Sequence, residues 1–195
     1  MTTFVLATHN AHKVGELRRI LGDALGPHEL VGYDGPEPVE DGATFAANAL
    51  IKARAAAAHT GLPALADDSG IAVDSLGGDP GIHSARYAGT RDDGDNLRLL
   101  LDNLRGVADR RARFVCAAAL VPVPGEGEEH VELGEWHGFV LDAPAGDGGF
   151  GYDPVFRPEG EVRSAAELTP DEKDAVSHRA RAFRALTVVL RERYG

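Results

Sequence analysis

The spacing of apolar residues changes sharply near the N-terminus. Residues 4–7 form a short apolar run, which predicts a buried strand, and the polar residues 8–10 follow it at once. Val14, Leu17 and Leu21 then recur at the spacing of an amphipathic helix. A strand, a tight polar turn and a helix in this order predict the start of an α/β unit.

The rest of the chain alternates between apolar segments and loops rich in glycine, proline and acidic residues. Thr44 is placed to cap an alanine-rich helix that runs to His59. The strand that starts near Leu65 is expected to pause at the polar residues 67–70 and to resume at 71–73. The other predicted elements are loops at 33–44, 77–95 and 142–160, a helix with an apolar stripe from Leu97 to Leu104, and a hairpin of strands 113–123 and 130–141.

The final helix carries the clearest start signal in the sequence. Thr169 occupies the N-cap, Pro170 the first helical position, and Glu172 completes a capping box. The apolar positions from Phe183 to Leu190 mark the buried face of the same helix. Together these elements predict a single domain of mixed α/β class over residues 1–195.

Composition and charge narrow the possible classes of function. The 195-residue chain is 43% hydrophobic and 26% charged, as soluble globular proteins are, and its net charge is -11. So acidic a surface repels a nucleic-acid backbone, which argues against general DNA or RNA binding but leaves room for a small phosphorylated ligand. Cys116, the only cysteine, is expected in the core. Neither a secretion signal nor a membrane span is visible, which favours the cytoplasm.

Thr8, Asn10 and Lys13 lie where the first strand ends and the first helix begins. Backbone N–H groups and the helix dipole attract phosphate at such a position, and these three side chains add further donors. The alternative interpretation is that Asn10 caps the helix and Lys13 is solvated. A motif this short leaves both interpretations open.

Asp67-Asp68-Ser69-Gly70 places two adjacent carboxylates before a Ser-Gly turn. Carboxylates gathered in this way need a shared cation or proton, and Mg²⁺ typically takes one or two of them together with water and substrate phosphates. Glu40, in the acidic loop before the second helix, is a plausible second ligand. The competing interpretation is an Asx turn with solvated acids.

Residues 148–154 combine several glycines with Phe150, Tyr152 and Asp153. Glycine lets a ligand approach the backbone, an aromatic ring can stack on a base, and a carboxylate can accept from ring N–H groups. These features favour a base-binding loop. The two rings could equally anchor the loop to the core.

Lys173, His178 and Arg179 are three basic residues near the start of the last helix. A basic residue in the first turns of a helix opposes the helix dipole, so a negatively charged ligand would explain Lys173 better than capping does. The alternative is a solvated helix face.

These motifs, in this order and spacing, resemble the inosine triphosphate pyrophosphatase family, whose members hydrolyse deaminated purine nucleotides. The resemblance extends from Phe4 to about Leu190. The matching blocks are residues 8–13, 45–53, 66–70, 80–87, 149–154 and 177–179. The resemblance implies an elongated α/β fold of two lobes with a central nucleotide-binding cleft, dependence on Mg²⁺, and a homodimer.

Carried over residue by residue, the resemblance also implies a set of functional residues. Asp68 would be the general base and, together with Glu40, would bind Mg²⁺. The substrate-binding residues would be Thr8, His9, Asn10, Ala11, His12, Lys13, Lys52, Ser69, Phe150, Gly151, Tyr152, Asp153, Lys173, His178 and Arg179. The chain departs from the family pattern at His9, where glycine is common, and at Ala47, where an acid is frequent.

The implied reaction is hydrolysis of ITP, dITP or XTP to the nucleoside monophosphate and pyrophosphate. Arg179 can only donate hydrogen bonds, so it suits the oxygen at C6 of these bases and not the amino group of adenine. Two alternatives stay open, a Maf-like pyrophosphatase acting on pyrimidine or modified nucleotides and a non-catalytic nucleotide sensor. A plain interaction domain would not explain the polar motifs in the loops.

Overall fold

The computed structural model describes the backbone of residues 1–195 and every side chain except those of Ala11, Asp23 and Ala24. The strands are β1 (Thr3–Leu6), β2 (Glu29–Gly32), β3 (Ala64–Val73), β4 (Arg111–Val121), β5 (His130–Val140) and β6 (Phe156–Pro158). The α-helices are α1 (Ala11–Leu21), α2 (Phe45–Thr60), α3 (Asp93–Asn103), α4 (Pro170–Val176) and α5 (His178–Tyr194). The predicted mixed α/β class is confirmed.

The six strands form one sheet in the order β2-β1-β3-β4-β5-β6. β1 runs parallel to both β2 and β3, with Leu6 opposite Leu65 in the second pairing. β5 and β6 are antiparallel, with Gly138 opposite Pro158. β4 and β5 are neighbours in the sheet, as the predicted hairpin requires.

The chain divides into two compact units. Unit 1 contains residues 1–68, 116–134 and 178–195, and unit 2 contains residues 69–115 and 135–177. The single domain and the central cleft expected from the sequence stay predictions. None of the helices among the described residues has the length and apolar composition needed to cross a membrane.

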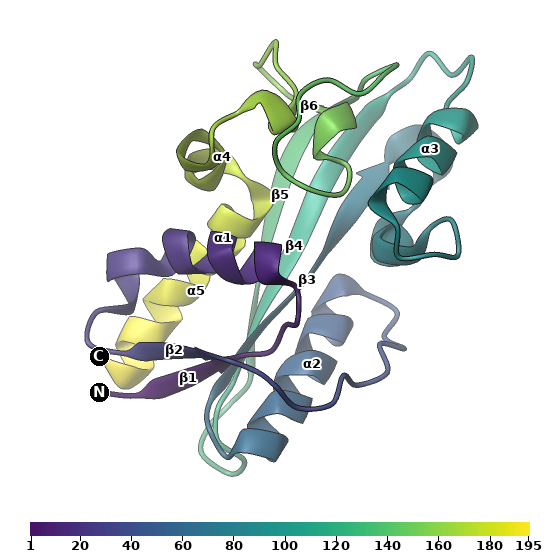
Figure 1. Ribbon diagram of the computed structural model, residues 1–195. Coiled ribbons are helices and arrows are strands. Elements are labelled where there is room, and N and C mark those ends of the chain that lie inside the picture. Colours follow the sequence, from purple (N-terminus) through teal and green to yellow (C-terminus); the bar gives the residue numbers. More distant parts are fainter. The chain divides into compact units, whose positions relative to one another are not determined.

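Within unit 1, successive residues of β1 and of β3 alternate between two separate apolar clusters. Phe4, Leu6 and Leu65 pack with residues of α1 and α5, which contact each other (Figure 1). Ala64 and Ala66 pack with α2, which contributes four alanines to the second cluster. Successive side chains of a strand point to opposite faces, so the part of β3 in unit 1 presents Leu65 to α1 and α5 and presents Ala64 and Ala66 to α2.

Unit 2 has an apolar core of its own. Leu97, Leu100 and Leu104 enter it as the helical stripe predicted from their spacing. Trp136 and Phe156 belong to the same cluster, with ring centroids 5.4 Å apart. This core supports the loop of residues 149–153, because Tyr152 is one of its buried members.

The predicted interruption of the strand at residues 67–70 is wrong. β3 continues without a break from Ala64 to Val73, and both aspartates on it are buried. The acidic run looks like a turn because carboxylates normally avoid the interior. Here cationic side chains from distant segments compensate the two charges, which allows the strand to continue.

The prediction of one long final helix is also wrong. The capping box of Thr169 and Glu172 is present, but the helix that it starts ends at Val176. Ser177 is buried and extended, with φ -64° and ψ 160°, and its N–H group donates to the Lys173 carbonyl. Serine competes with helical hydrogen bonding through its own side chain, which favours a break between α4 and α5 at this position. The short strands β2 and β6 were not predicted either.

Candidate functional site

The corner between β1 and α1 is built around the Asn10 side chain. Its Oδ1 atom accepts hydrogen bonds from the N–H groups of His12 (2.9 Å) and Lys13 (3.2 Å). The Asn10 N–H group in turn donates to Thr8 Oγ1 at 3.1 Å. Asn10 is therefore the N-cap of α1, and it uses two of the N–H groups that were expected to attract phosphate.

The other residues of this corner differ in exposure. His9 and His12 are exposed, and Thr8 is half-buried. His9 Nδ1 lies 3.3 Å from Glu37 Oε1. The side chain of Ala11 lies outside the described residues, so its predicted contact with substrate stays a prediction.

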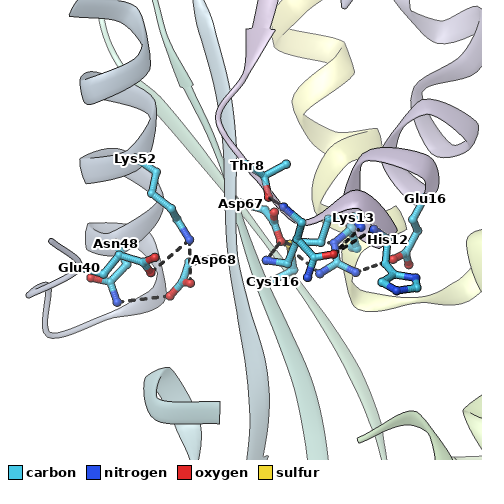
Figure 2. Close-up of polar contacts among 12 residues, drawn as sticks. Thr8, His12, Lys13, Glu16, Glu40, Asn48, Lys52, Asp67, Asp68 and Cys116 are labelled. Carbon is cyan, nitrogen blue, oxygen red and sulfur yellow. Dashed lines mark hydrogen bonds and ion pairs between the residues drawn. The ribbon is translucent and has the colours of Figure 1, made fainter. Parts of the chain in front are cut away.

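Asp67 and Asp68 point to opposite sides of β3, as Figure 2 shows. This direction follows the parity of the strand, because Leu65 and Asp67 face α1 and α5 whereas Ala66 and Asp68 face α2. The two carboxylates therefore do not converge on one point, and the metal ion expected at Asp68 stays a prediction. Each belongs to a separate group of side chains within unit 1.

The Asp67 group joins α1, β3 and α5, and all of its side chains are buried except that of Lys13, which is partly buried. Asp67 Oδ2 accepts from Lys13 Nζ at 2.9 Å and from Arg179 Nε and Nη2 at 3.3 Å and 3.2 Å. Arg179 Nη1 donates to Glu16 Oε2 at 2.7 Å. The guanidinium side chain is only 1% exposed, and Lys13 is not solvated as the alternative interpretation supposed.

Charge compensation sets the protonation states in this group. Burial by itself would raise the pKa of Asp67, but Lys13, Arg179 and Lys52 together hold it well below its ordinary value. Burial would lower the pKa of Arg179, and Asp67 and Glu16 raise it instead. Burial also raises the pKa of the nearby Cys116 thiol, in agreement with the prediction that this cysteine is a core residue.

The Asp68 group lies on the α2 side of the strand. Lys52 Nζ donates to Asp68 Oδ1 at 3.0 Å and to Glu40 Oε2 at 3.2 Å. Asn48 Nδ2 donates to Asp68 Oδ2 at 3.3 Å, while Asn48 Oδ1 accepts from the N–H group of Gly42 at 2.8 Å. Asn48 thus ties the loop that carries Glu40 to the carboxylate on β3 (Figure 2).

The protonation of Asp68 shifts in the opposite direction from that of Asp67. Burial raises the pKa of Asp68, Glu40 adds to this effect, and Lys52 offsets only part of it. The pKa of Lys52 is raised because Asp68, Asp67 and Glu40 outweigh its burial. A carboxyl with a raised pKa is a better proton acceptor near neutral pH, as general bases require.

The donor set around Lys52 fits a divalent cation with oxygen ligands. Glu40 and Asp68 both direct a carboxylate oxygen at the same ammonium nitrogen, so the two groups converge. Mg²⁺ commonly uses one or two protein carboxylates and completes its coordination with water and phosphate. No group of three or more His, Cys, Asp or Glu side chains in the described part of the chain is arranged to hold a metal ion.

In unit 2, the predicted base-binding loop is held by several polar contacts. Asp153 Oδ2 accepts from the Phe150 N–H group at 2.9 Å and from Lys173 Nζ at 2.6 Å. Lys173 Nζ also lies 5.0 Å from the centre of the Phe150 ring, at cation–π distance. The N–H group of Gly151 donates to Asp93 Oδ2 at 2.8 Å.

Tyr152 and Phe150 differ within this loop. Tyr152 is 5% exposed, and its hydroxyl donates to the Ser84 carbonyl at 2.8 Å, so it anchors the loop. Phe150 is half-buried. The arrangement gives Tyr152 the anchoring function that was the alternative for both rings, and a contact of either ring with substrate stays a prediction.

The three basic residues of the final segment separate at Ser177. Lys173 joins Asp153 in unit 2, whereas His178 and Arg179 belong to unit 1. His178 is 4% exposed. Ser69 is half-buried at the point where β3 passes into unit 2. Their predicted contacts with substrate are not tested by these positions.

Asp67, Glu16 and Asn48 were not among the predicted site residues. Two of them carried a readable signal, because Glu16 is three residues from Lys13 and Asn48 is four residues from Lys52. Residues three or four apart share one face of a helix. Lys13 and Lys52 therefore each marked a polar neighbour on the same helix.

Comparison with known proteins gives consistent matches over the whole chain. The model of the Ham1 family matches residues 4–189. A dITP/XTP pyrophosphatase from Streptomyces coelicolor is 56% identical over 202 residues, covering 100% of both chains. A dITP/XTP pyrophosphatase from Leifsonia xyli is 57% identical, covering 98% of this chain and 96% of the relative.

Solved structures give the same result. A HAM1 protein from Coxiella burnetii matches with a TM-score of 0.89 and 40% identity, covering 98% of this chain and 100% of that chain. A nucleoside-triphosphatase / dITP/XTP pyrophosphatase from Mycobacterium abscessus matches with a TM-score of 0.75 and 49% identity, covering 94% and 97%. These matches agree with the resemblance inferred from the sequence motifs.

Proposed function

We propose that this chain, which belongs to the Ham1 family, hydrolyses non-canonical purine nucleoside triphosphates such as dITP, ITP and XTP. The products would be the nucleoside monophosphate and pyrophosphate. The relatives named dITP/XTP pyrophosphatase support this reaction, since they match the chain from end to end. The observation that carries the proposal is the buried Asp68 carboxyl with its raised pKa, next to a second carboxylate and a lysine.

Asp68 is the proposed general base. Its raised pKa brings the carboxylate closer to the working pH, which improves proton transfer from an attacking water. The water oxygen bonds to the α-phosphorus, its proton passes to Asp68, and the bond from the α-phosphorus to the bridging oxygen breaks to release pyrophosphate. Asn48 holds Asp68 by a hydrogen bond and so fixes the direction of the carboxylate.

Glu40 and Asp68 are the proposed ligands of Mg²⁺. When bound, the ion would neutralise charge on the triphosphate and lower the pKa of a coordinated water. Lys52 and Lys13 supply the fixed cationic groups of unit 1 for the phosphates, because in phosphoryl transfer charge neutralisation and positioning account for most of the catalysis.

Phe150 and Arg179 are the proposed base-recognition residues. Phe150 is half-buried, and Lys173 and Asp153 hold the loop around it. Arg179 donates only, which suits the oxygen at C6 of hypoxanthine and xanthine. The proposal also includes a homodimer in the cytoplasm, which rests on the family resemblance. Sedimentation of the purified protein would test the dimer.

Pyrophosphate release tests the proposal directly. The purified protein would be assayed with dITP, XTP, dGTP, dATP and dTTP, each with Mg²⁺ and with excess EDTA. We expect release from dITP and XTP at rates at least tenfold above the other three, and its loss in EDTA. Preference for a pyrimidine triphosphate would favour the Maf-like alternative. Binding of dITP without any release would favour a nucleotide sensor.

A further inference from the structure

Asp67 has no part in the reaction as proposed, yet it is one of the most highly constrained side chains of unit 1. Its side chain is 0% exposed. A single oxygen, Oδ2, accepts from Lys13 at 2.9 Å and from two nitrogens of Arg179 at 3.2 Å and 3.3 Å. The carboxylate thus joins α1, the first α-helix, to α5, the last α-helix.

We propose that Asp67 is a positioning residue that fixes Lys13 and Arg179 relative to each other, so that phosphate binding and base selection depend on one carboxylate. This inference rests on the proposed function, in which Lys13 contacts the triphosphate and Arg179 the base. Asp67 itself contacts neither part of the substrate.

Electrostatics explain why the two cations need this carboxylate. Because both bind the same oxygen, Lys13 Nζ and Arg179 Nη2 are at most about 6 Å apart in a buried place, where like charges repel strongly. Asp67 replaces that repulsion with two attractive contacts. Without its charge, we expect the more mobile lysine to move away and the guanidinium to turn.

Glu16 provides a matched comparison on the other side of the guanidinium. Its Oε2 atom accepts from Arg179 Nη1 at 2.7 Å. Among the described side chains Glu16 makes no ion pair with Lys13, whereas Asp67 pairs with both cations. Loss of Glu16 should therefore disturb Arg179 alone, and loss of Asp67 should disturb both.

The test compares Asp67→Asn with Glu16→Gln by two readouts. Inorganic tripolyphosphate, which has no base, reports on the phosphate end through its inhibition constant. The ratio of kcat/KM for dITP over dGTP reports on the base end. We expect Asp67→Asn to weaken tripolyphosphate inhibition about tenfold and to reduce the selectivity ratio about tenfold. Glu16→Gln should reduce the ratio but leave tripolyphosphate inhibition within about twofold.

A merely structural contribution of Asp67 predicts a different result. A smaller folded fraction lowers kcat and leaves the inhibition constant and the selectivity ratio unchanged, and that outcome would overturn the inference. If Asp67→Asn does not fold, Asp67→Glu keeps the charge but displaces it by one methylene, and unchanged values of both readouts in this variant would overturn the inference equally.

Failure of the proposed function can be distinguished from failure of the inference about Asp67. If the wild-type protein releases no pyrophosphate from any purine triphosphate, the proposed function fails. Calorimetric binding of tripolyphosphate to the wild type and to Asp67→Asn would still test the Lys13 half of the inference, with equal affinities contradicting it.

Discussion

Asp67 and Asp68 are adjacent on one strand, both are buried, and their surroundings have opposite effects on them. Asp67 faces α1 and α5, where Lys13 and Arg179 hold its pKa far below the ordinary value. Asp68 faces α2, where burial raises its pKa despite the contact with Lys52. Burial acts on both carboxyls in the same direction, and the cations on each face decide whether the pKa is lowered, as for Asp67, or stays raised, as for Asp68.

Two neighbouring residues of one strand can thus serve different functions, one holding cations and the other exchanging a proton. A permanently ionised carboxylate is suited to holding cations in place, because its charge does not vary with conditions. A carboxylate whose proton is easily gained is suited to acid–base chemistry. Since successive strand residues face opposite sides, the two carboxylates hydrogen-bond to different lysines, Asp67 to Lys13 and Asp68 to Lys52.

The largest expected effect is on turnover. Asp68→Asn removes the proposed proton acceptor but keeps the size and one hydrogen-bond acceptor of the side chain. We expect kcat for dITP to fall by about 10²–10⁴-fold, as for the loss of a general base. Binding of dITP, measured by calorimetry, should stay within about threefold. Wild-type turnover in this variant would exclude Asp68 as the general base and would contradict the functional difference between Asp67 and Asp68.

The next largest effect is on the free energy of unfolding, which should fall for the Asp67 variant and not for the Asp68 variant. Asp67→Asn removes the carboxylate that pairs with Lys13 and leaves Arg179 paired with Glu16, so it should lower the free energy of unfolding at pH 7 by about 3 kcal/mol. Asp68→Asn should leave it unchanged or raise it, because a carboxyl whose pKa is raised on folding opposes folding when ionised. Urea unfolding of both variants and the wild type measures the difference.

The same experiment has a pH dependence with a defined direction. The pKa of Asp67 is lowered on folding, so its contribution to stability is present above the unfolded value near ~4 and is lost as the pH falls towards the folded value. The stability gap between the wild type and Asp67→Asn should therefore narrow as the pH falls from about 5 to about 3, through and below the unfolded pKa. A gap that stays constant over this range would contradict the ionised state of Asp67.

The smallest expected effect is at His9, which belongs to neither the Asp67 group nor the Asp68 group. Its side chain is exposed and makes one ion-pair contact, with Glu37 at 3.3 Å, and one ring contact, with Tyr33 at 5.5 Å between centroids. Exposed contacts of this kind contribute little, so His9→Gly should change kcat/KM for dITP by less than about fivefold. Glu37→Gln removes only the ion pair and serves as the control. A loss above tenfold would place His9 in the substrate site.

Much of this arrangement could be predicted from sequence, where the signal is local. The strand–turn–helix corner at Lys13, the cap at Thr44 and the capping box at Thr169 all follow from residue spacing and short-range hydrogen bonding. The motifs also identified Asp68, Glu40 and Lys52, and the structure brings these three together.

The separation of the two aspartates could not be predicted in the same way. An acidic pair followed by Ser-Gly is typical of a turn, and it can form a buried strand only because Lys13, Lys52 and Arg179 arrive from distant parts of the chain. The break at Ser177 was missed for a related reason. No glycine or proline marks it, and the distribution of Lys173 and Arg179 between different units depends on tertiary packing.

A carbon-13 NMR titration of the Asp67 and Asp68 carboxyl groups, in metal-free protein, tests the central claim most directly. We expect Asp68 to titrate above the ordinary aspartate pKa of about 3.9. We expect Asp67 to stay ionised at pH values below that pKa, down to the pH at which the protein unfolds. Two neighbouring carboxyls that titrate together, or Asp67 titrating above Asp68, would contradict it.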